Sequence, residues 1–238
     1  MKLPVINAPK YPIHLVGIDR ELHYRPFQIG EEKILLMAME SGEQDDMVNA
    51  VKQILTQCIE ETDIDIDNMP VFDIEYMFLH LRKRSIGENV ELHFSLEKCK
   101  EKKCTNPITL DINLDEIQLT KDPRHSKTIQ LTDEIGIVMG YPTLKMVGFD
   151  ASNNVMGGFA LVRKCIEKVF TSDDSFNTKD CSEEEVDAFI NSLTKKQFEK
   201  IEEFFETMPK ISKTFLVECP KCGSKEDITL DGIHNFFV

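Results

Sequence analysis

Two cysteines near the C-terminal end of the chain have the spacing of a metal-binding turn. Cys219 and Cys222 are separated by Pro220 and Lys221, and Gly223 follows directly. A Cys-x-x-Cys loop can present two sulfur atoms to one metal ion, and glycine tolerates the left-handed backbone that such a tight turn needs. A structural zinc ion takes four ligands. This pair therefore predicts one half of a site.

A second cysteine pair lies far upstream in a segment of the same plan. Cys99 and Cys104 follow a predicted strand over 89–98, in which apolar and polar residues alternate. Each pair is followed by the same tetrapeptide, Ile-Thr-Leu-Asp, at 108–111 and again at 228–231. Two such hairpins facing each other have the geometry of a zinc ribbon.

The predicted ligands of one structural Zn²⁺ ion are thus four thiolates, from Cys99, Cys104, Cys219 and Cys222. The ion would tie distant parts of the chain together and contribute roughly 10–16 kcal/mol to folding, on the scale of zinc fingers. The four-residue gap in the first pair is at the long end of ligand spacing. One alternative is that the pairs are free thiols on hairpin turns. Another is that Cys181 or a histidine completes the site.

The composition predicts a soluble globular protein that works in a reducing compartment. Hydrophobic residues make up 41% and charged residues 29% of the 238 residues, and no apolar run approaches the roughly 20 residues of a membrane span. A formal net charge of −14 argues against a general binder of duplex DNA. Seven cysteines without an export signal favour metal binding over disulfides.

The elements that must position the cysteines predict an α+β fold, with a mostly helical body and β-hairpins that carry the zinc-ribbon-like site. Prolines in 1–29 predict an extended arm that packs on its own domain. Thr128 to Met139 predicts a strand pair around the turn at 132–134, and the acidic run 60–67 predicts a solvated loop. Apolar periodicity and capping residues predict helices over 31–39, 44–59, 72–83, 155–170, 182–190 and 194–208.

The predicted division of the chain falls between the helices and the first hairpin. Residues 1–88 form an N-terminal arm and helical region, and 89–238 carry the two hairpins. The hairpins occupy 89–114 and 214–232, with an α+β region inserted at 115–213. A single compact domain is the alternative.

No catalytic constellation is evident, so we predict that the protein is not an enzyme. The sequence contains no phosphate-binding loop, dinucleotide fingerprint or Ser/His/Asp order, and its six histidines form no spaced pair. The acidic run 60–67 lacks the glycine and the distal glutamate of a calcium-binding loop. A redox role for Cys219 and Cys222 lacks the βαβ context of a thioredoxin.

Several stretches resemble a family of baseplate proteins of T4-like myophages. They are FDIEYMFLHLRKRSIGE at 72–88, RPFQIGEEKILLMAMESG at 25–42, YPTL at 141–144, and the terminal cysteine turn followed by ITLDGIHNFF. The resemblance covers most of the chain. It implies a non-enzymatic baseplate hub subunit, or a chaperone-like factor of viral tail assembly, that binds other hub and tail proteins of the bacteriophage.

The resemblance also implies a place of action. Assembly would occur in the host cytoplasm, and the protein would either stay in the tail baseplate as a virion component or leave afterwards. The apolar end, 233–238, either folds back on the core or docks on another subunit. Because lysines surround both cysteine pairs, a zinc-ribbon module for nucleic-acid binding or transcription is the alternative function, although the net charge makes nucleic acid a poor partner.

Overall fold

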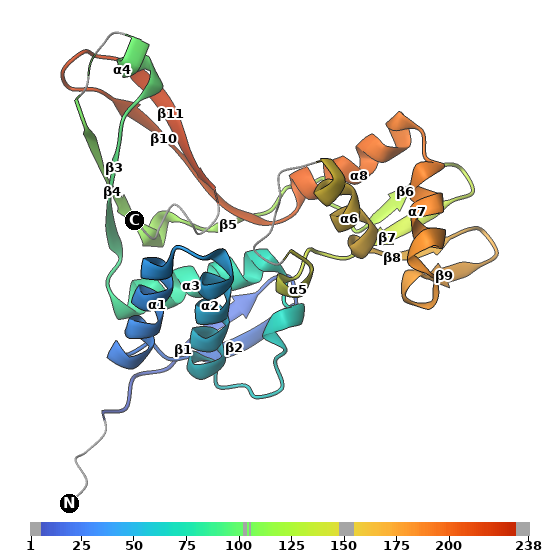
Figure 1. Cartoon of the computed structure of the whole chain (residues 1–238), viewed down its shortest axis with the longest axis horizontal. Helices are drawn as coiled ribbons and strands as arrows, with labels where there is room; N and C mark the ends of the chain where they lie inside the picture. Colours follow the sequence, from blue (N-terminus) through green and yellow to red (C-terminus); the bar gives the residue numbers. More distant parts are fainter. Residues whose placement is uncertain (1–5, 102–103, 105, 148–154, 232–238) are drawn as a thin grey trace, which may run out of the picture. The chain divides into compact units, whose positions relative to one another are not determined.

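The structure, a computed structural model, describes residues 6–101, 104, 106–147 and 155–231 (Figure 1). Helices and several small sheets alternate along it, so the predicted α+β class is confirmed. No helix in these ranges is both long and apolar enough to span a membrane. The predicted docking end at 233–238, as well as Lys102 and Lys103 beside the first cysteine pair, lies outside the described residues.

The chain divides into two compact units, each built from separate stretches of sequence. Unit 1 comprises Met1–Ile64, Phe72–Thr120 and Lys210–Val238. Unit 2 comprises Asp65–Val71 and Lys121–Pro209. The predicted division at residue 88 stays a prediction.

Unit 1 begins with a hairpin that packs against helices. Strands β1 (Tyr11–Leu15) and β2 (Arg20–Tyr24) pair antiparallel, and helices α1 (Ile29–Ser41), α2 (Gln44–Cys58) and α3 (Val71–Ser85) follow. The inward residues of the hairpin are buried, so the N-terminal arm packs on its own unit where it is described. These residues are Ile13, Leu15, Leu22 and Tyr24.

Helix α3 is buried on several faces, and the sequence predicts a helix over 72–83. Met77, Phe78 and Leu81 are completely buried. Asp73 is also buried, and its carboxylate accepts hydrogen bonds from the backbone N–H groups of Gly17 and Ile18, each at 3.1 Å. A buried carboxylate requires such donors, so Asp73 fastens the turn of the first hairpin to α3.

Two further hairpins of unit 1 face each other. Strands β3 (Asn89–Phe94) and β4 (Ile108–Asn113) form one, and β10 (Lys210–Glu218) and β11 (Lys225–Asp231) form the other. The short strand β5 (Leu119–Thr120) pairs with the outer side of β10. Apolar residues of both hairpins share one core, which includes Val90, Leu92, Ile112, Ile211 and Leu230.

The repeated tetrapeptide has the same role in both hairpins. Ile108 to Asp111 lies in β4, and Ile228 to Asp231 lies in β11, so each copy is on the returning strand. Ile108 and Leu230 are buried, whereas Thr109 and Thr229 are exposed. The alternation places the apolar members of both copies toward the shared core.

The predicted strand over 89–98 is wrong at its end. The strand stops at Phe94, and the short helix α4 (Glu97–Glu101) follows. Leu96 is completely buried between the two, which anchors the change of direction. The alternation of apolar and polar residues could not predict this short helix, because a single helical turn is too short to show a helical period.

Unit 2 has a four-stranded antiparallel sheet in the order β6 (Thr128–Gln130), β7 (Gly136–Met139), β8 (Ile166–Phe170) and β9 (Ser175–Asn177). The strands β6 and β7 form the predicted pair. The helices of the unit are α5 (Leu144–Val147), α6 (Val155–Cys165), α7 (Glu183–Asn191) and α8 (Lys195–Thr207). Capping boxes begin α7 at Ser182 and α8 at Thr194, as predicted.

The predicted helix over 155–170 is wrong beyond Cys165. The chain passes directly from α6 into β8, which pairs with β7 on one side and β9 on the other. Periodicity cannot separate a short buried strand from the end of a buried helix. The β8 strand also requires glycine opposite Phe170, because a Cβ atom on Gly136 would lie 2.2 Å from the Phe170 ring.

Short 3₁₀ turns complete both units. They are η1 (Ile66–Asn68), η2 (Leu114–Glu116) and η3 (Thr178–Asp180). The acidic run 60–67 is a loop that ends in η1, but it is not wholly solvated. Ile66 is buried, and the Glu61 carboxylate accepts the backbone N–H of His23 at 3.0 Å.

Candidate metal centre

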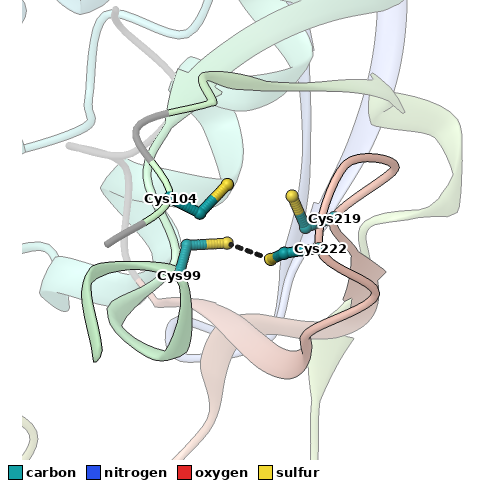
Figure 2. A group of neighbouring side chains, drawn as sticks. All are labelled: Cys99, Cys104, Cys219 and Cys222. Carbon is teal, nitrogen blue, oxygen red and sulfur yellow. Dashed lines mark hydrogen bonds between the residues drawn. The ribbon is translucent and has the colours of Figure 1, made fainter. Parts of the chain in front are cut away.

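The four predicted cysteines lie together at the ends of the β3–β4 and β10–β11 hairpins of unit 1 (Figure 2). Their Sγ atoms all lie within 4.8 Å of one another, and those of Cys99 and Cys222 are 3.5 Å apart. Four sulfurs placed tetrahedrally about 2.3 Å from a zinc ion are about 3.8 Å from one another. The arrangement therefore fits one tetrahedral ion.

Helix α4 brings the first pair together. Cys99 lies on this helix, and the backbone N–H of Cys104 donates to the Cys99 carbonyl oxygen at 2.8 Å. This hydrogen bond holds the backbone of Cys104 next to that of Cys99. The two cysteines thus lie close together despite the long spacing of the sequence motif.

The second pair forms a tight turn between β10 and β11. The backbone N–H of Gly223 donates to the Cys219 carbonyl oxygen, and that of Cys219 donates to the Ser224 carbonyl oxygen, both at 2.9 Å. Gly223 has a φ angle of 66°, in the left-handed region that glycine adopts without strain. The predicted role of this glycine is confirmed.

Ser224 is the hydrogen-bond partner of one sulfur of the site, and the Cys222 thiol donates to its hydroxyl oxygen. Its hydroxyl oxygen lies 3.3 Å from the Cys222 Sγ, and Ser224 is itself buried. Hydrogen bonds from the Ser224 side chain and backbone lower the pKa of Cys222 below its usual range. Metal ions bind thiolates rather than thiols. This turn therefore prepares a sulfur for coordination.

Burial has the opposite effect on the facing cysteine. Cys99 and Cys219 are 0% and 1% exposed. Burial, followed by the neighbouring sulfurs of Cys222 and Cys219, raises the pKa of Cys99 well above its usual range. Several thiolates cannot share so small a volume without a positive charge between them. A bound divalent cation would supply that charge.

The residues around the sulfurs fasten the two hairpins to each other. Leu96, Ile108 and Val217 form a small buried apolar layer beside the cysteines. The Lys98 Nζ atom donates to the Lys225 carbonyl oxygen at 2.9 Å. The sulfur cluster thus belongs to a contact between segments more than a hundred residues apart in sequence.

Other cysteines lie elsewhere. Cys58 and Cys165 are buried among apolar residues, and burial raises the pKa of Cys58 to about 11. The Cys181 thiol donates to the Asn177 carbonyl oxygen at 3.4 Å. In the described ranges, the four-cysteine cluster is the one group of at least three His, Cys, Asp or Glu side chains placed to share an ion, and it includes neither Cys181 nor a histidine.

Sequence reasoning missed two residues of this region. Ser224 influences the Cys222 thiol, and its position directly after Gly223 was the available signal. Lys98 bridges the hairpins, but its partner is a backbone carbonyl, which no sequence pattern reveals.

The cluster can bind a metal but offers little to a reaction. Sulfur would occupy all four positions around a tetrahedral ion and leave none for water or substrate. Such closed sites are structural.

Comparison with known proteins gives one match. The family model described as T4 bacteriophage base plate protein matches residues 8–238, which include both cysteine pairs. No curated protein and no solved structure matches the chain.

Proposed function

Because the chain belongs to the T4 bacteriophage base plate protein family, we propose that it is a subunit of the baseplate hub or a factor that assembles the hub. It acts through contacts with other baseplate and tail proteins and catalyses no reaction. The observation that carries this proposal is the family match over 8–238. The protein acts in the host cytoplasm during assembly, and as a hub subunit it would stay in the tail baseplate of the virion, whereas as an assembly factor it would leave.

The proposed role of the four cysteines is to hold one structural zinc ion. The support is geometric, since four sulfurs from two hairpins converge within 4.8 Å. Soft thiolate ligands in a tetrahedral set favour zinc over magnesium or calcium. The ion would make the two hairpins a zinc-ribbon-like unit and keep them in a fixed relation for docking.

The alternative of nucleic-acid binding has less support. Lys225 makes an ion pair with Glu218 at 2.9 Å. The Lys98 ammonium donates a hydrogen bond to the Lys225 carbonyl oxygen. Both lysines near the cysteines therefore already have a partner within the chain. The net charge of the chain is −14. A polyanion would meet repulsion over most of such a surface.

Pairwise binding between purified proteins tests the proposal. The full chain is immobilised, and each hub and tail protein of the same phage is offered separately at moderate salt. We expect stable retention of at least one hub protein. Retention of none of them would overturn the hub assignment.

A second measurement separates a resident subunit from an assembly factor. Quantitative mass spectrometry of purified virions detects the chain at a fixed copy number if it stays in the baseplate. Its presence in assembly intermediates but not in virions would assign it to assembly alone. A salt titration against single-stranded and duplex DNA checks the alternative, because phosphate contacts weaken steeply with salt.

A further inference from the structure

Unit 2 has an apolar groove that the four-cysteine site does not involve. Helices α6 and α8 form its two sides, and the volume is about 760 Å³. Sites that hold a ligand commonly measure about 300–1,000 Å³. Most of the lining is apolar, with Val71, Pro142, Phe159, Leu161, Val162, Phe198, Phe205 and Met208.

The groove is not a defect in the core of the unit. Val162, Ile201 and Phe204 lie beneath it and are at most 6% exposed, so the core is already closed. Phe159 is nevertheless 42% exposed. Its ring stacks on that of Phe198, with centroids 5.0 Å apart. An exposed aromatic pair above a complete core is typical of a surface that another molecule covers.

Two glutamates lie at the edge of the groove, and among the described residues the charge attraction found for them is the long-range one between Glu206 and Arg124. Glu202 and Glu206 line it, are exposed, and lie one helical turn apart on α8. Like charges at this spacing repel each other. Within the part of the chain that the structure describes, neither of them makes a salt bridge.

The other glutamates of the same helix differ in this respect. Glu199 lies 3.9 Å from the Lys195 ammonium, and Glu203 lies 3.9 Å from the Arg124 guanidinium. Helix α8 therefore forms salt bridges with its acidic side chains away from the groove, whereas the two at the groove form none among the described residues and Arg124 attracts Glu206 only from a longer distance. A cation from outside the chain would complete the pattern.

We propose that this groove binds an apolar helical segment of another baseplate protein, with large apolar side chains against Phe159 and Phe198 and a lysine or arginine beside Glu202 and Glu206. The identity of the partner rests on the proposed function. A second copy of the chain is a poor occupant, because the edge of the groove is acidic and the net charge is −14. A fatty acid or another anionic amphiphile meets the same repulsion.

The primary test uses a defined probe and the full chain. The probe is a labelled amphipathic peptide with leucines at helical i, i+4 and i+7 positions and lysines at their flanks. A matched peptide has glutamate in place of every lysine. Fluorescence anisotropy reports the Kd, and a ¹³C-methyl label on methionine locates the binding. We expect the Met208 signal in the groove to shift, and the signal of the fully buried Met139 to stay.

Two double substitutions on α8 form a matched pair. Glu202→Lys with Glu206→Lys changes the groove, and Glu199→Lys with Glu203→Lys makes the same charge change outside the groove lining. We expect the first to weaken the lysine peptide by about tenfold or more and the second by less than about threefold. Phe159→Ala should also weaken it, and circular dichroism verifies that each variant is folded.

Several results would overturn the groove assignment. They are equal weakening by both double substitutions, equal affinity for the lysine and glutamate peptides, and an unshifted Met208 signal. The same variants offered to a hub protein that binds the wild type separate the two proposals. Undiminished binding by the Glu202→Lys, Glu206→Lys variant overturns the groove as the contact and leaves the hub function standing.

Discussion

The hairpin tip of unit 1 and the core of unit 2 both contain a completely buried cysteine, but the two thiols have different surroundings. Cys165 lies among Ile137, Met139 and Ile166 in the core of unit 2, and burial raises its pKa to about 12. Cys99 is equally buried, yet three other sulfurs lie within 4.8 Å of it. Burial of a thiol therefore does not distinguish a core residue from a candidate metal ligand. The neighbouring sulfurs and the backbone donors do.

The two regions also differ in what can hold them together. Unit 2 packs α6, α7 and α8 around a continuous apolar core that includes Ile201 and Phe204. The tip has a smaller layer of buried apolar residues, Leu96, Ile108 and Val217, with partly buried residues such as Phe94 and Phe215 packed against it. We infer that packing stabilises unit 2, whereas the tip depends on its ion.

Removal of the ion should have the largest effect, and only at the tip. We expect one zinc per chain in the wild type and none in Cys219→Ser, with loss of a metal-binding free energy of roughly 10–16 kcal/mol. Hydrogen exchange should show lost protection in β3, β4, β10 and β11, while β7 and β8 stay protected. Metal analysis together with exchange mass spectrometry makes the measurement. Unchanged protection in the four hairpin strands would show that packing alone holds the tip.

Truncation of a core side chain in unit 2 should have the next largest effect. It should destabilise unit 2 and leave the hairpin tip of unit 1 unchanged. Phe204 is 2% exposed. The centroid of its ring lies 5.0 Å from the ring centroid of His125 and 5.8 Å from that of Tyr141. Phe204→Ala removes these contacts and leaves a cavity, so we expect a loss of about 3–5 kcal/mol in unfolding free energy. Denaturant unfolding measures it. The zinc content should stay at one per chain, and a loss of zinc would contradict the independence of the two regions.

A third prediction concerns His80 on α3, whose protonation makes the unfolding free energy depend on pH. Burial, with the positive charges of Lys83 and Arg84, lowers the pKa of His80 to about 4 against an ordinary value of 6.5, and Asp115 opposes the shift. The unfolded chain therefore takes up a proton at this residue between those pH values, before the folded chain does. The stability that neutral His80 contributes is complete above pH 6.5 and is lost as the pH falls toward 4, by about 3 kcal/mol.

The variant His80→Leu isolates this contribution. Acid would also protonate the four cysteines and release a bound zinc ion, but this effect would be the same in both proteins. The difference in unfolding free energy between wild type and His80→Leu should therefore change by about 3 kcal/mol from pH 7 to pH 4. Urea titrations at several pH values measure this difference. A difference that does not vary with pH would mean that His80 is not buried as a neutral ring.

The smallest expected effect comes from the core thiol. Cys165→Ala deletes one sulfur atom from an apolar environment, so we expect a loss of about 1 kcal/mol in unfolding free energy. The zinc content should not change. This variant is the control for Cys219→Ser, since both replace a buried cysteine. A loss of zinc from Cys165→Ala would break the comparison between the two regions.

Part of this fold could be predicted because its signals are local. The capping boxes at Ser182 and Thr194 begin helices where the sequence predicts them, since a cap needs only residues three apart. The apolar periodicity over 72–83 predicts α3 because it too repeats within three or four residues. The predicted helix beyond Cys165 failed because strand β8 is defined by its pairing with β7 and β9, and those partners are distant in sequence.

The sequence could predict which cysteines form the candidate site, but not the backbone contacts that hold them together. Two cysteine pairs followed by the same tetrapeptide were enough to choose Cys99, Cys104, Cys219 and Cys222. The hydrogen bond between the backbones of the first pair and the bridge from Lys98 to the Lys225 carbonyl involve backbone atoms, which every residue has. No residue pattern encodes such contacts uniquely.

The sequence by itself determined which side chains could bind a metal and which family the chain resembles, because residue type and spacing carry both signals. Only the tertiary structure decided that the four sulfurs meet and that Cys58, Cys165 and Cys181 stay apart from them. It also decided that Glu202 and Glu206 edge an apolar groove while Glu199 and Glu203 are paired. The physical reason is that the distances between sulfur atoms and between charged groups depend on how segments distant in sequence pack. Residue type and spacing alone do not specify that packing.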